Sequence, residues 1–190
     1  MENFSLILAI VVITALAFDF TNGFHDTANA MATTISTGAL KPKVAVVMSA
    51  ALNLLGAFLS VEVANTISKG LVDETGIRPE VIFAALVGAI LWNLLTWLVG
   101  LPSSSSHALM GGLIGATIAS AGTGAVHGDV LVTKVLLPAL AAPIVAGLAA
   151  MVATPLSYVL GREAPGQAAD KGFRAGQIAP AGPVSLAPGP

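Results

Sequence analysis

The chain has 190 residues, of which 55% are hydrophobic and only 9% are charged, whereas an ordinary soluble domain carries about 25% charged residues. This composition excludes a soluble domain and predicts an all-α polytopic membrane protein that contacts the lipid bilayer. The net charge of -2 offers no basic surface for nucleic acid, and the absence of cysteine excludes disulfides and thiol chemistry.

Hydrophobic runs predict about five membrane segments, since a span needs about 20 apolar residues. We expect residues 1–160 to form one transmembrane domain and residues 161–190 to be a polar, Pro- and Gly-rich tail that is disordered. A hydrophilic loop at residues 62–80 separates the second segment from the third. The segments are residues 4–40, 44–61, 81–100, 105–121 and 130–160.

A polar stretch, residues 18–40, lies within the first segment and does not suit lipid. The apolar run before it has about 15 residues, which is too short to span, so the first helix must continue into the polar stretch. Gly23 lies where the two meet, and we expect the backbone to open there, giving a broken first helix. Six polar side chains of this stretch share one face at helical spacing. They are Asp19, Asn22, Asp26, Asn29, Thr33 and Ser36.

This polar face predicts a cation site. A carboxylate inside a membrane costs several kcal/mol unless it is compensated, and no Lys or Arg lies near the two acids in sequence. Oxygen ligands from these side chains and from opened backbone carbonyls suit a hard cation such as sodium, or one carboxylate takes up a proton instead. In the alternative interpretation, Asp26 and Asn29 bridge helices. The candidate cation ligands are Asp19, Asn22, Asp26 and Asn29.

Four consecutive serines stand between the third and fourth segments with no charged loop around them. We expect a re-entrant Ser-rich hairpin, because irregular backbone at membrane depth must be buried in protein or line a cavity. The serines would cap the helix that follows, whose first N–H groups and positive dipole end favour an anion. The candidate anion ligands are Ser103, Ser104, Ser105 and Ser106.

Two histidines lie beside these features. His25 belongs to the polar stretch and His107 follows the serines, and each is a candidate for a proton relay, a ligand contact or a satisfied interior imidazole. A hydrolytic triad of Ser106, His107 and Asp26 is disfavoured, because adjacent Ser and His rarely give triad geometry and no Gly-x-Ser-x-Gly elbow is present. We therefore predict no enzyme activity, no catalytic residue and no cofactor.

Two motifs resemble a known family. Residues 23–30, Gly-Phe-His-Asp-Thr-Ala-Asn-Ala, with Ser-Thr-Gly-Ala-Leu at 36–40, closely resemble the first signature of the inorganic phosphate transporter (PiT) family. Residues 101–109, Leu-Pro-Ser-Ser-Ser-Ser-His-Ala-Leu, with Gly111 and Gly112, resemble its second element. The family includes sodium- and proton-coupled phosphate carriers and some sulfate permeases, and the resemblance extends to about Gln177.

The resemblance implies a symporter of the cell membrane, built from two inverted repeats, with phosphate and the coupling cations bound between re-entrant segments. It assigns Asp26 and Asn29 to cation and phosphate, and the four serines to phosphate oxygens. The coupling ion is sodium or a proton. Sulfate is the alternative substrate, since hydroxyls and helix-end amides read any tetrahedral oxyanion.

The sequence departs from the family in one respect. Family members carry a second copy of the Asp/Asn signature, and none appears before Pro190. We therefore expect one half of an inverted-repeat transporter, which needs a complementary half or a homodimer partner. The alternative is an inactive, truncated membrane remnant.

Overall fold

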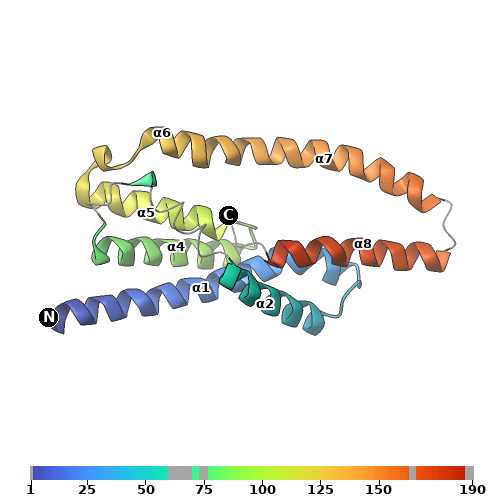
Figure 1. The fold of residues 1–190 in the computed structure, drawn as a ribbon, viewed down its shortest axis with the longest axis horizontal. Coiled ribbons are helices and arrows are strands. Elements are labelled where there is room, and N and C mark those ends of the chain that lie inside the picture. Colours follow the sequence, from blue (N-terminus) through green and yellow to red (C-terminus); the bar gives the residue numbers. More distant parts are fainter. Residues whose placement is uncertain (1, 60–69, 73–76, 163–165, 187–190) are drawn as a thin grey trace.

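The computed structural model describes residues 2–59, 70–72, 77–162 and 166–186, and nearly all of them are helical (Figure 1). This confirms the predicted all-α fold. The elements are α1 (Glu2–Ser36), α2 (Pro42–Leu59), α4 (Pro79–Val99), α5 (Ser105–Ala121), the 3-10 turn η2 (Thr123–Ala125), α6 (Gly128–Val130), the π-helical turn η3 (Leu131–Leu136), α7 (Leu137–Arg162) and α8 (Gly166–Leu186).

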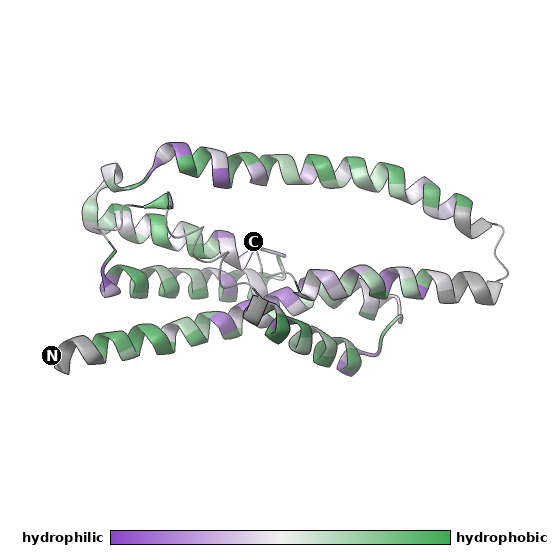
Figure 2. Ribbon diagram, in the orientation of Figure 1, coloured by the Kyte–Doolittle hydropathy of each residue, from purple (hydrophilic) through white to green (hydrophobic). Residues whose placement is uncertain are grey.

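Within the described part of the chain, three helical segments are long and apolar enough to cross a membrane: Leu6–Ser36, Pro79–Val99 and Gly128–Val159. Figure 2 shows the apolar colouring along these helices, with polar residues concentrated where the elements meet near the middle of the molecule. The second and fourth predicted segments are also helices, but shorter ones. The chain is thus a multi-pass integral membrane protein. Most of the predicted hydrophilic loop, residues 62–69 and 73–76, lies outside the described residues.

The first helix is not broken at Gly23, contrary to the sequence-based expectation. α1 runs without interruption from Glu2 to Ser36, and the chain leaves the helix only near Gly38, whose φ of 70° is a left-handed conformation. A glycine inside a helix costs about 1 kcal/mol relative to alanine, which is less than the cost of exposing unpaired backbone groups at membrane depth. The polar side chains of residues 19–29 therefore lie along a regular helix.

The tail also differs from the expected disorder, because α8 occupies Gly166–Leu186. Its Ala181 is buried in a cluster with Met31 of α1 and Ala45 of α2. The Thr37 hydroxyl, just after α1, donates to the Gln177 side-chain oxygen at 2.6 Å. The polar composition predicts disorder, but packing of the apolar face of α8 against α1 and α2 stabilises the helix. Residues 163–165 and 187–190 lie outside the described residues.

α1 is the element against which the others assemble. Figure 1 shows α4 beside α1, with α5 on the far side of α4, and α2 and α8 beside the second half of α1. The first apolar cluster joins Phe18 of α1 to Leu86 and Ala89 of α4, whereas the second surrounds Met31. The polar residues of α1 lie between these two clusters. In contrast, α7 runs apart from the bundle, and none of its residues from 137 to 159 is buried.

α4 and α5 form a closely packed hairpin. A Cβ atom added to Gly112 would lie 2.4 Å from the carbonyl oxygen of Ala85, so only glycine fits at this contact. Small residues at helix interfaces in membranes allow such backbone approach. The hairpin holds the serine turn, which we define as residues 103–106, at the end of α4 and the start of α5.

Replacing Gly112 with alanine should destabilise the protein by about 1–3 kcal/mol, because the added methyl overlaps a backbone atom that cannot move without separating the helices. The measurement is the thermal unfolding midpoint in detergent. Gly111→Ala is the matched control, since a Cβ there meets nothing within 4 Å. Equal midpoints for the two variants would contradict the close contact.

Candidate functional site

The polar face of α1 meets the serine turn through Asn22. The Ser105 hydroxyl, which is buried, donates to the Oδ1 atom of Asn22. Asp26 lies one helical turn further along α1, on the same face of the helix as Asn22. Because Oδ1 accepts from Ser105, the amide group of Asn22 is the part of this side chain that has protons to offer an acceptor. The contact of Ser105 with Asn22 therefore places the serine turn against the face of α1 that carries Asp26.

A second connection between α1 and the serine turn passes through α4. The Thr96 hydroxyl lies 3.0 Å from the hydroxyl of Ser103 and 3.4 Å from Nε2 of His25. His25 is buried, with 4% of its surface exposed, and its ring stacks on Phe24. The serine turn is thus fixed to α1 both directly and by way of α4.

The interface of α1 and α4 carries polar residues that sequence reasoning missed. Asn93 is fully buried, and its side-chain amide donates to the Thr21 hydroxyl at 3.3 Å. The sequence pattern places Asn93 and Thr96 within the apolar segment 81–100. Their spacing of three was the available signal, because it places both on one helical face directed at α1. The Nδ1 atom of His25 and the Oδ1 atom of Asn93 are buried and have no hydrogen-bond partner among the residues that the structure describes.

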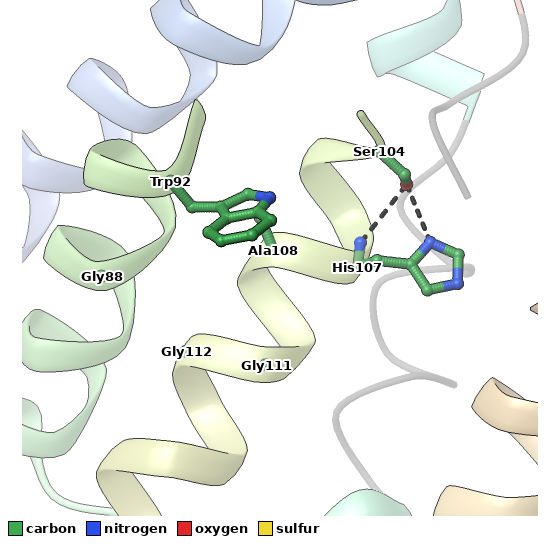
Figure 3. Close-up of a pocket in the computed structure, with 7 residues that line it drawn as sticks. All are labelled: Gly88, Trp92, Ser104, His107, Ala108, Gly111 and Gly112. Carbon is green, nitrogen blue, oxygen red and sulfur yellow. Dashed lines mark hydrogen bonds between the residues drawn. The ribbon is translucent and has the colours of Figure 1, made fainter. Parts of the chain in front are cut away.

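Ser104 caps α5, as the sequence predicts. Its backbone is extended (φ -92°, ψ 118°), and its hydroxyl accepts from the His107 amide at 3.3 Å. The His107 ring adds a contact from Nδ1 to the same hydroxyl at 2.9 Å (Figure 3). By helix geometry, the first amides of α5, at Ser105 and Ser106, have no intrahelical acceptor. The start of α5 therefore presents N–H groups and the positive end of the helix dipole.

A pocket of about 410 Å³ opens beside this helix start, between α4 and α5. Figure 3 shows Trp92 of α4 facing α5 across the groove, with Ser104 and His107 as the polar groups at one end. The remaining lining is small and apolar. The full set is Gly88, Trp92, Ser104, His107, Ala108, Gly111 and Gly112.

The predicted cation ligands are not all together. Asp26 is half-buried, but Asp19 and Asn29 are exposed along α1. Asp19 and Asp26 are seven residues apart, a rise of about 10 Å, so one small cation cannot contact both carboxylates directly. Among the described residues, no group of three His, Cys, Asp or Glu side chains could hold a metal ion. A cation at Asp26 would take its other ligands from amide, hydroxyl or backbone oxygens.

The two histidines occupy different surroundings. His25 is buried against Thr96, whereas His107 is exposed and contacts Ser104. The fourth serine, Ser106, lies half-buried in the first turn of α5. The structure thus brings together Asn22, Asp26 and the serine turn, and leaves Asp19 and Asn29 on the outer surface of α1.

Comparison with known proteins identifies relatives of the chain. The profile of the phosphate transporter family matches residues 22–184. A Mycobacterium bovis protein described as a "probable low-affinity inorganic phosphate transporter" is 58% identical over 183 residues, which cover 96% of this chain and 44% of the relative. A Bacillus subtilis protein with the same description is 42% identical, covering 94% of this chain and 54% of that protein. The chain spans about half the length of these curated relatives.

A solved structure shares the fold. It is described as the sodium-dependent phosphate transporter, and it superimposes with a TM-score of 0.72 at 29% sequence identity. The match covers 80% of this chain and 39% of that one. The part of the fold described above is therefore similar to somewhat less than half of a larger transporter.

Proposed function

Because the chain belongs to the phosphate transporter family, we propose that it forms part of a carrier that moves inorganic phosphate across the cell membrane together with a cation. The observation that carries this proposal is the contact of Ser105 with Asn22, one helical turn from Asp26 on the same face of α1. It joins a carboxylate suited to a cation and a helix start suited to an anion.

The two sites would depend on each other for electrostatic reasons. An anion entering a low-dielectric region without Lys or Arg needs positive charge nearby, and a cation held by Asp26 supplies it. The oxyanion would then accept hydrogen bonds from serine hydroxyls and from the first amides of α5. Cation binding would therefore precede phosphate binding. Sodium is favoured as the cation by the description of the matched structure, and a proton is the alternative.

Phosphate is favoured over sulfate, because the matched relatives are described as inorganic phosphate transporters. The whole carrier would require a second set of ligands, since this chain spans about half of those relatives. We propose that a complementary half or a second copy of the chain supplies it. His25 and His107 remain candidates for proton transfer in a proton-coupled carrier.

Reconstitution of the full chain in proteoliposomes tests the proposal. Uptake of labelled phosphate is measured with a sodium gradient and, in a separate experiment, with a proton gradient. Uptake should rise with one of the two gradients, and that gradient identifies the coupling ion. Excess unlabelled phosphate should compete for uptake, and sulfate should compete weakly. Calorimetry with phosphate, with and without sodium, shows whether the chain binds but lacks its other half. Gradient-independent flux together with no heat of binding would refute the proposal and indicate an inactive remnant.

A further inference from the structure

Thr96 joins three elements although it lies in neither of the two signature motifs. It is on α4, with 5% of its surface exposed, between His25 of α1 and Ser103 of the serine turn. Its hydroxyl also lies 2.9 Å and 3.1 Å from the carbonyl oxygens of Trp92 and Asn93. Four potential partners therefore surround a single hydroxyl group.

The number of protons limits how these contacts are made. A threonine hydroxyl has one proton and two lone pairs, and a carbonyl oxygen only accepts. Whenever the Thr96 proton goes to a carbonyl or to His25, the 3.0 Å contact requires Ser103 to donate its own proton to Thr96. Ser105 likewise donates to Asn22. Two of the four serines then direct their protons into the protein.

Ser104 differs from these two serines. It accepts from the His107 amide, so capping uses a lone pair and not the Ser104 proton. When Nδ1 of His107 carries a proton, the ring also donates to this hydroxyl, and the Ser104 proton is then available to a ligand. It is also the serine that lines the pocket. An oxyanion needs donors, so Ser104 and the N–H groups at the start of α5 suit phosphate oxygens better than Ser103 or Ser105 does.

We propose that Thr96 is a positioning residue that anchors Ser103 and so keeps the serine turn oriented with Ser104 towards the ligand; this rests on the proposed phosphate site. Thr96 itself does not touch phosphate. It acts through the turn, by holding one end while the contact of Ser105 with Asn22 holds the other.

The test compares three variants of the full chain in lipid nanodiscs. Thr96→Val keeps the shape and removes the hydroxyl, whereas Thr96→Ser keeps the hydroxyl. Thr14→Val is the matched control, because the Thr14 hydroxyl donates to the Ile10 carbonyl at 2.8 Å within α1. Two quantities are measured: hydrogen–deuterium exchange of residues 101–106 without ligand, and phosphate affinity by calorimetry in sodium.

Thr96→Val should exchange roughly fivefold faster in the turn and bind phosphate roughly fivefold more weakly, as expected for the loss of one hydrogen bond. Thr96→Ser should restore both quantities to within about twofold, and Thr14→Val should change neither. Wild-type behaviour of Thr96→Val, or a Thr96→Ser variant as impaired as Thr96→Val, would overturn the proposal. If the wild-type chain binds no phosphate, the proposed function fails, and the exchange rates alone decide the role of Thr96.

Discussion

Asp26→Asn is expected to weaken cation-dependent phosphate binding at least roughly hundredfold, because losing one charge of a buried pair costs about 3–5 kcal/mol and each 1.4 kcal/mol is a factor of ten. The asparagine keeps the size of the side chain and one hydrogen-bonding oxygen. Any loss of affinity therefore measures the contribution of the negative charge of Asp26, which lies one helical turn from Asn22. The measurement is phosphate affinity by calorimetry at fixed sodium concentration, followed by sodium affinity at fixed phosphate concentration.

Two further acids provide controls for Asp26. Asp129→Asn, at an exposed position in α6, should leave both affinities unchanged. Asp19→Asn removes a charge on the same helix, but about 10 Å from Asp26, and should have a much smaller effect. Equal losses in Asp19→Asn and Asp26→Asn would mean that the α1 charges act only as a diffuse field and that Asp26 holds no cation.

Ser104→Ala should weaken phosphate binding by roughly tenfold to hundredfold, since a hydrogen bond to a charged group contributes about 1.5–3 kcal/mol. The same change removes the cap of α5, which costs a further ~1 kcal/mol of stability. Ser104→Gly separates the two effects, because glycine at this position lowers helix stability by only a few tenths of a kcal/mol. Its affinity should fall as far as that of Ser104→Ala.

Ser120→Ala is the matched control for Ser104. It lies at the other end of α5, and its hydroxyl donates to the Thr117 carbonyl at 3.2 Å. Affinity and unfolding midpoint should both stay near those of the wild type. If Ser104→Gly retained full affinity, the serine hydroxyl would be a structural cap with no contact to phosphate.

Sequence reasoning located the two ends of the candidate site but not what connects them. The polar face of α1 and the serine cap are visible because polar residues in an apolar chain are costly, and their spacing gives the face. The contact of Asn22 with Ser105 joins residues 83 positions apart. Such pairing depends on how helices pack, which local spacing does not encode. The spacing of Thr96 and Asn93 indicates a shared polar face of α4, but it does not predict the contacts of Thr96 with His25 and Ser103.

Two local expectations about the backbone were wrong for a common cause. The intrinsic backbone preferences of glycine and proline predict a break at Gly23 and disorder in the tail, but both are helical in the structure. Within α8, packing of Ala181 against Met31 and Ala45 provides stabilisation that the helix propensity of the Pro- and Gly-rich sequence does not. Tertiary contacts regularly override such preferences, most of all in apolar surroundings where an unpaired backbone group has no water to bind.

The fit of Gly112 against Ala85 limits how the serine turn can move. Two helices whose backbones touch cannot slide along each other without first separating, so α4 and α5 should tilt as one rigid unit. The serine turn lies at one end of this rigid unit, where a small rotation gives the largest displacement. Any alternation of access would therefore move all four serine hydroxyls together. The contacts of Ser105 with Asn22 and of Thr96 with His25 would have to break before the serine turn could move away from α1.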